Sequence, residues 1–130
     1  MSASENKAAI QAVFDKLAVD PMQVFTALTE LCHPDVETLE APGFSYGGTY
    51  RGVDGLIQAM LMASAQMTDM SKARVEEIVA DGDHVIVRMR VPWELPPEPA
   101  GEALVSEWYT FRGGKIARIE PFFWDLYGRA

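Results

Sequence analysis

The sequence has few of the features that mark several common protein classes. Cys32 is its only cysteine, so no disulfide can form within the chain, and a reducing, cytoplasmic compartment is expected. Eleven lysine and arginine residues against 19 aspartate and glutamate residues give a net charge of -8, which argues against nucleic acid or an anionic membrane as a partner. No apolar run approaches the roughly 18 residues of a membrane span, and the opening MSASENKAAI lacks the pattern of a signal peptide.

The hydrophobic periodicity predicts one α+β domain over residues 1–130. Apolar side chains at helical spacing, with a capping box at Ser2 and Glu5, predict helices over about residues 2–17, 21–31 and 53–65. A short strand is expected at 36–40, followed by a Gly- and Tyr-rich connection over 42–52. Beyond Ser71 the period changes to two and predicts a meander of about four strands. This order favours helices packed on one face of an antiparallel sheet.

Two lone carboxylates, Glu107 and Asp125, stand among apolar neighbours in the last two strand-like runs. An isolated acid on an apolar face costs stability unless it is paired, hydrogen-bonded or protonated, and proton chemistry in apolar cavities uses such residues. The alternative for Asp125 is an ordinary residue that caps the end of a strand. The alternatives for Glu107 are exposure to solvent, or an ion pair with one of three arginines, Arg88, Arg90 or Arg118.

The turn at Gly113-Gly114 decides which way Glu107 points. A two-residue turn would set Glu107 opposite Glu120, which opposes like charges. A three-residue loop with a glycine bulge would set Glu107 opposite Ile119. We favour the second register because it pairs apolar positions with each other and turns Glu107 toward the apolar side of the sheet.

Pro121 decides which way Asp125 points. A bulge at Pro121 would turn Trp124 inward and Asp125 outward. Without a bulge, about six residues at roughly 3.3 Å each separate Asp125 from the position opposite Glu107. The two acids are therefore expected to act separately rather than as one coupled pair.

Several segments together resemble the SnoaL-like part of the nuclear-transport-factor-2-like superfamily. They are the two opening helices, YGGTYRGVDGL before the third helix, ADGDHVIVR, and FRGGKIARIEPFFWDL, and the resemblance covers about Asn6 to Tyr127. It implies a cone-shaped, curved antiparallel sheet that three helices from the N-terminal half close around an apolar cavity. Members of the superfamily are usually dimers, so a homodimer through the sheet is expected. They include enzymes and non-catalytic binding proteins, so the fold does not decide the function.

The resemblance carries over to catalytic positions only in part. Ketosteroid isomerases have a tyrosine at the position of Phe14, a general-base aspartate at Ala41, and a protonated aspartate at Glu107. The Arg-x-Asp of epoxide hydrolases of this fold matches Arg88–Arg90, which lacks the aspartate. The aromatic-aspartate pattern of SnoaL-type cyclases matches Trp124-Asp125, so this template is the least contradicted.

Two functions from different classes follow. In the first, the protein is an acid–base enzyme of the cyclase, isomerase or lyase type acting on a small hydrophobic carbonyl compound, without metal or cofactor. Asp125 would take a proton from carbon, and Glu107 or Tyr109 would donate a hydrogen bond to the enolate. In the second, the cavity only holds a small hydrophobic molecule, and Glu107 is exposed or paired with arginine. Side chains expected to bind the ligand are Phe14, Tyr46, Tyr50, Met60, Met89, Trp93 and Trp124.

Overall fold

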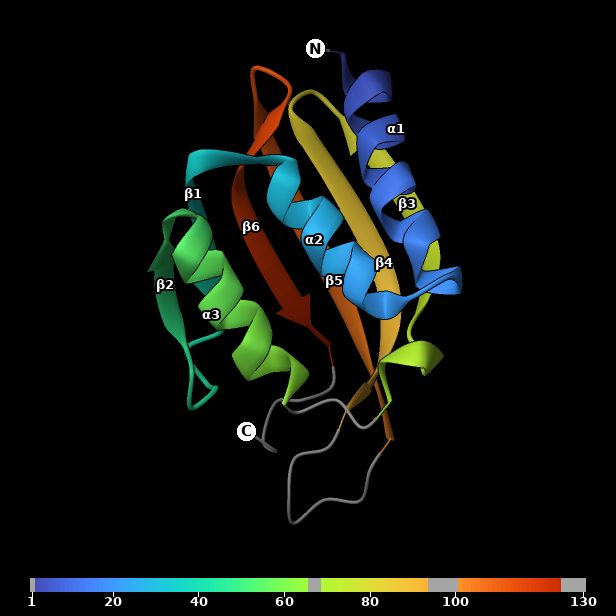
Figure 1. Ribbon diagram of the computed structural model, residues 1–130, viewed down its shortest axis with the longest axis vertical. Helices are drawn as coiled ribbons and strands as arrows, with labels where there is room; N and C mark the ends of the chain where they lie inside the picture. The colour runs from blue at the N-terminus through green and yellow to red at the C-terminus, as the bar shows by residue number, and fades with distance from the viewer. Residues whose placement is uncertain (1, 66–68, 94–100, 125–130) are drawn as a thin grey trace.

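Three α-helices cover one face of a curved, six-stranded sheet (Figure 1). The computed structural model describes residues 2–65, 69–93 and 101–124, so Asp125 lies outside the described residues. The helices are α1 (Ala3–Phe14), α2 (Pro21–Glu30) and α3 (Gly52–Ser64), with short 3-10 turns at Asp15–Ala18 and Met70–Lys72. The strands are β1 (Cys32–Glu40), β2 (Gly48–Arg51), β3 (Arg74–Asp81), β4 (His84–Trp93), β5 (Gly101–Arg112) and β6 (Lys115–Phe123).

Local signals set the starts of the first two helices. The Ser2 hydroxyl accepts a hydrogen bond from the Glu5 N–H at 3.2 Å, and the Glu5 carboxylate accepts one from the Ser2 N–H at 3.1 Å, which completes the predicted capping box. Asp20 accepts a hydrogen bond from the Met22 N–H at 3.0 Å, and Pro21 occupies the first helical position. The three predicted helices are confirmed, each to within a few residues.

The strand order is β2-β1-β6-β5-β4-β3, and all neighbours are antiparallel except β1 and β6, which are parallel. The sheet is therefore mixed, and the expectation of a wholly antiparallel sheet is wrong. Thr38 of β1 lies beside Ile119 of β6, a residue from the other end of the chain. The direction of such a distant pairing follows from the path of the chain through the intervening helix and strands, which local periodicity does not report.

The four-stranded meander is confirmed as β3 to β6, whereas the strand at the other edge of the sheet was not foreseen. Strand β2 lies within the stretch predicted to be a connection, and it pairs with β1 from Glu37↔Arg51 to Glu40↔Gly48. β2 has only four residues, and its glycine and tyrosine content resembles that of a loop. Its strand geometry depends on the edge that β1 offers, so the sequence alone gave no signal for it.

The β5–β6 hairpin has a register that differs from both predicted ones. The loop is a two-residue turn, with φ of 60° at Gly113 and 80° at Gly114, and Arg112 pairs with Lys115. The ladder then shifts by one residue at Ala117, so that Tyr109 pairs with Ile119 and Glu107 with Pro121. The predicted three-residue loop is wrong because the extra residue sits within β6. The bulge still joins apolar positions, and Glu107 still faces the apolar side.

Candidate functional site

A cavity of about 100 Å³ lies between the helices and the sheet. An engineered apolar cavity of roughly 150 Å³ is known to hold benzene, so this volume fits a molecule of about one ring. Apolar and aromatic side chains form most of the lining, including Phe14, Leu28, Leu56 and Met60 from the helices. The polar side chains in the lining are Thr38, Glu40, Ser64, Glu107 and Tyr109.

Glu40 is the last residue of β1, and it points into the cavity. Alternation along β1 turns Val36, Thr38 and Glu40 inward, while Glu37 faces outward and pairs with Arg51 at 3.1 Å. Glu40 is only 9% exposed, and no hydrogen bond or ion pair joins its carboxyl group to any described residue. The pKa of Glu40 is raised from 4.5 to about 8. Burial is the main cause, and repulsion by the nearby Glu107 carboxyl group is the second.

Glu40 was not among the predicted site residues, because the family resemblance placed the position of the base at Ala41. The alternation of Val36, Thr38 and Glu40 was the available signal. A strand that presents an apolar residue, a threonine and a glutamate on one face carries an acid on the side that the helices cover. The acid in the cavity at this end of β1 is therefore one residue earlier than the resemblance implied.

Glu107 and Tyr109 point into the cavity from the same face of β5. The Tyr109 hydroxyl donates a hydrogen bond to Oε2 of Glu107. Glu107 keeps some accessible surface because it borders the cavity, but protein atoms surround it. Burial raises the pKa of Glu107, and the hydrogen bond from Tyr109 only partly offsets this. Burial also raises the pKa of Tyr109, and the Glu107 carboxyl adds to that effect, so the phenol stays protonated.

The arginines that could have neutralised Glu107 are engaged on the outer face of the sheet. Arg88 and Arg90 pair with Glu76 at 3.3 and 3.0 Å, and Arg118 pairs with Glu120 at 3.3 Å. None of the ion pairs among the described residues includes Glu107. The alternative in which Glu107 is paired with arginine is wrong, since alternation along the strands separates the arginines from the inward face.

The two glutamates lie on the same inward face of the sheet, on either side of β6. Thr38 of β1 pairs with Ile119, and two residues further along both strands Glu40 reaches the level of Pro121, which pairs with Glu107 on the other side. The β1–β6 ladder ends at Ile119, and Pro121, which follows on this face of β6, has no N–H to extend a ladder. The β6 side chains that line the cavity are all apolar: Ile119, Pro121 and Phe123.

The described end of β6, up to Trp124, alternates regularly past Pro121. The ladder shows no register shift at Pro121, and the side chain of Phe123 lines the cavity. Phe122 and Trp124 point outward and are 55% and 79% exposed. The expectation that Trp124 binds the ligand is therefore wrong, because regular alternation turns it to solvent.

The other predicted ligand-binding residues divide into two groups. Phe14, Met60 and Met89 line the cavity, whereas Tyr46, Tyr50 and Trp93 do not.

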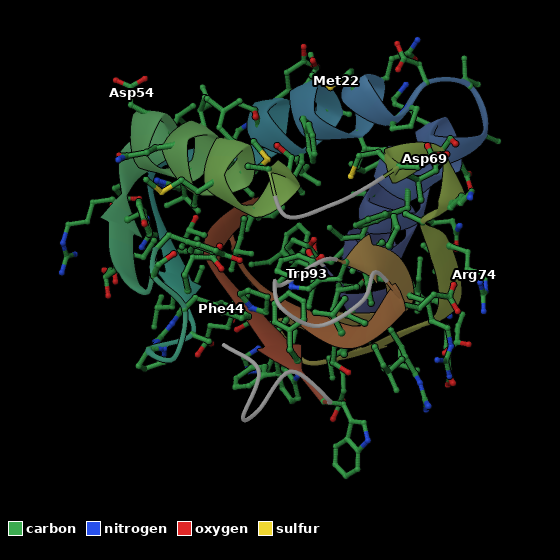
Figure 2. All side chains as sticks on the ribbon, turned by 90° about the horizontal axis from the view of Figure 1, so that it is seen from below. Met22, Phe44, Asp54, Asp69, Arg74 and Trp93 are labelled. Carbon is green, nitrogen blue, oxygen red and sulfur yellow. The ribbon has the colours of Figure 1, made fainter. Side chains whose placement is uncertain are left out.

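An aromatic cluster accounts for two of the three residues that do not line the cavity. Phe44 stacks on Tyr46 with ring centroids 5.1 Å apart, and Trp93 lies 4.9 Å from Phe123. Figure 2 shows Trp93 within the space that sheet and helices enclose, with Phe44 on the side of β1 and β2. The Tyr50 hydroxyl donates to the Tyr46 carbonyl at 2.6 Å. Tyr46 and Trp93 thus belong to an aromatic cluster with Phe44 and Phe123 rather than to the lining of the cavity.

Within the part of the chain that the structure describes, no three His, Cys, Asp or Glu residues gather in a way that could hold a metal ion. No described helix combines the length and the hydrophobicity that crossing a membrane requires. The site is thus defined by two glutamates and a tyrosine in an otherwise apolar cavity.

A cone of sheet closed by helices around an acid-bearing apolar cavity is the architecture of nuclear-transport-factor-2-like proteins. The family model of the SnoaL-like domain matches residues 10–119, so the chain belongs to the SnoaL-like domain family. None of the curated proteins matches the sequence.

Solved structures show the same fold. Bal32a, from a soil-derived mobile gene cassette, is 17% identical with a TM-score of 0.76, over 96% of this chain and 93% of its own. TerC, crystallised with polyporic acid, is 22% identical with a TM-score of 0.71, and the match covers 94% of this chain and 93% of TerC. A candidate SnoaL-like polyketide cyclase from a Jannaschia species is 18% identical with a TM-score of 0.73, over 95% and 88%. At these identities the similarity establishes the fold alone.

Proposed function

We propose that the protein is a cofactor-independent acid–base enzyme of the cyclase, isomerase or lyase type, acting on a small hydrophobic carbonyl compound. The observation that carries this proposal is the pair Glu40 and Glu107, two carboxyl groups in one apolar cavity whose pKa values are both raised. Perturbed acids in a cavity are characteristic of sites that move protons. We assign the role of base to Glu40, which lines the cavity, whereas Asp125, the base expected from the sequence, lies outside the described residues.

The chemistry follows from the protonation states of the two acids. The Glu40 carboxylate takes a proton from the carbon next to the carbonyl, and the C–H electron pair moves to form the enolate. Two interacting acids hold one proton between them after the first step of their titration. In the form in which Glu107 carries that proton, it accepts a hydrogen bond from Tyr109 on one oxygen and donates from the other to the enolate oxygen. Return of the proton to a different carbon completes an isomerisation, and loss of a leaving group completes an elimination.

Mutual repulsion keeps the two acids in different states. Two carboxyl groups that interact release their protons in two steps, and the first charge opposes the second. A pKa of about 8 for Glu40 lies close to a neutral working pH, where a general base is most effective. With one proton shared between the two acids, the pair supplies one base and one hydrogen-bond donor.

The test is proton exchange on a ketone that fits the cavity. Cyclohexanone and 3-cyclohexenone in D₂O are incubated with the protein, and NMR follows the loss of the signals from protons next to the carbonyl. We expect Glu40→Gln to slow the exchange by about 100-fold or more. Glu37→Gln, on the outward face of the same strand, is the matched control and should retain the wild-type rate. Wild-type exchange no faster than buffer, or full activity in folded Glu40→Gln, would refute the proposal.

A non-catalytic binding role is the second candidate. It is favoured by Phe14, which lines the cavity where the isomerases carry a tyrosine. Its expectation that Glu107 is paired with arginine or exposed does not match the hydrogen bond from Tyr109 inside the cavity. Saturable binding of cyclohexanone without exchange would favour this candidate over the enzyme.

A further inference from the structure

The cavity carries acidic groups and no basic ones. Among its described lining residues, the titratable side chains are Glu40, Glu107 and Tyr109, and lysine, arginine and histidine are absent. Helices α1, α2 and α3 and strands β4 and β6 contribute no charged side chain to this lining. Tyr46, the remaining titratable group beside Glu40, is a neutral phenol whose pKa is raised by burial and by Glu40. A ligand that enters the cavity therefore meets carboxyl groups and aromatic rings.

Glu40 is the acid in this lining that lacks a hydrogen-bond partner among the described residues. Only 9% of Glu40 is exposed, and its side chain borders the cavity. No described residue forms a hydrogen bond with its carboxyl group. Glu107, in contrast, already accepts a hydrogen bond from Tyr109. A buried carboxyl group without a donor costs stability, and a ligand that supplies a donor or a positive charge removes that cost. The unpartnered acid thus points to the chemistry of its ligand.

We propose that the cavity is a binding site for a small apolar amine, whose nitrogen pairs with Glu40 while its ring or chain packs against the aromatic lining. Phe14 and Tyr109 lie edge to face, with centroids 6.3 Å apart, and both border the cavity. Aromatic faces attract a cation, and the attraction strengthens where water is excluded. The same lining disfavours carboxylates and phosphates, because none of its described residues is a base that could balance their charge.

The proposal concerns the cavity of the proposed enzyme but does not require catalysis. An amine would bind there as a substrate group or as a competitor of the carbonyl compound. Its binding also has a proton signature. Below about pH 8 Glu40 holds a proton, so a protonated amine must displace it, and the affinity should rise by up to about tenfold per pH unit until Glu40 is ionised.

The experiment compares three probes of one size: benzylamine, benzyl alcohol and benzoate. Titration calorimetry at about pH 6, 7 and 8, in buffers of different ionisation enthalpy, gives both the affinity and the number of protons released. We expect benzylamine to bind about tenfold or more tightly than benzyl alcohol near pH 8, with proton release below that pH, and benzoate not to bind. Glu40→Gln should remove both the preference for the amine and the proton release, while Glu37→Gln should keep them.

Several results overturn the proposal. These are a wild-type protein that binds none of the probes, one that binds benzylamine no better than benzyl alcohol, one that binds benzoate equally well, and a folded Glu40→Gln that keeps the preference. Should Glu40→Gln fail to fold, the pH dependence and proton release of the wild-type protein decide the matter. A preference for the amine without proton exchange on the ketone would support the amine site and refute the proposed enzyme function. Exchange without a preference for the amine would support the enzyme function and refute the amine site.

Discussion

Glu40 makes the stability of the protein depend on pH, and replacing it with glutamine should remove most of that dependence. In the unfolded chain Glu40 loses its proton near pH 4.5, whereas in the folded protein it keeps the proton up to about pH 8. Between these values the unfolded state binds fewer protons than the folded state. The free energy of unfolding therefore falls as the pH rises, at about 1.4 kcal/mol per pH unit. The stabilisation is fully present below pH 4.5 and is lost as the pH passes through about 8.

The magnitude follows from the width of that interval. From about pH 5.5 to 8.5, the wild-type protein should lose about 3 kcal/mol through Glu40. This is a large share of the 5–15 kcal/mol that typically holds a domain together. Glu40→Gln, which resembles the neutral acid in shape, should match the wild type below about pH 4.5, and its advantage over the wild type should grow by about 3 kcal/mol between about pH 5.5 and 8.5. Glu107 still titrates in this variant, so a residual slope should remain, and a double variant with Glu107→Gln should flatten it.

Urea unfolding monitored by tryptophan fluorescence at each pH measures this difference. Glu37→Gln is the control, since that side chain lies on the outward face of the same strand, 3.1 Å from Arg51, and its curve should run parallel to the wild type. The informative quantity is the difference in the free energy of unfolding between the wild type and Glu40→Gln, because the contributions of the other titrating groups cancel in it. If that difference stays constant between about pH 5.5 and 8.5, Glu40 is not a buried, protonated acid, and the assignment of the base fails with it.

Two further predictions concern the backbone near the site and the outer face. A methyl group at Gly47 would lie 2.4 Å from the Ala41 carbonyl oxygen, so Gly47→Ala should cost about 2 kcal/mol or more in thermal unfolding. Gly101→Ala meets nothing within 4 Å and should change stability by about 0.5 kcal/mol at most, and equal effects at both sites would contradict the clash. The exposed rings of Trp108 and Phe122, with centroids 6.4 Å apart, favour the homodimer through the sheet that we expect. Light scattering should show a dimer that Phe122→Glu converts to a monomer, and a monomeric wild-type protein would contradict this expectation.

Much of the fold could be read from local sequence. Ser2 and Asp20 mark helix starts because a side-chain oxygen placed there binds the free N–H groups of the first turn. Alternation from Val85 to Val91 identified the inward face of β4, since side chains of a strand point to opposite sides in turn. The β5–β6 register was not predicted, because the bulge at Ala117 depends on contacts with both neighbouring strands.

The sequence by itself determined that Glu107 is an acid on an apolar strand face, and that helices would pack on a sheet with a meander, whereas the cavity was implied by the family resemblance. Tertiary structure alone decided that Glu40 belongs to the same site. Its burial is created by strands and helices from distant parts of the chain, and its pKa depends on that burial and on Glu107 across β6. Chemical identity and periodicity are local properties, but desolvation and the distance between two charges arise only when the chain has folded.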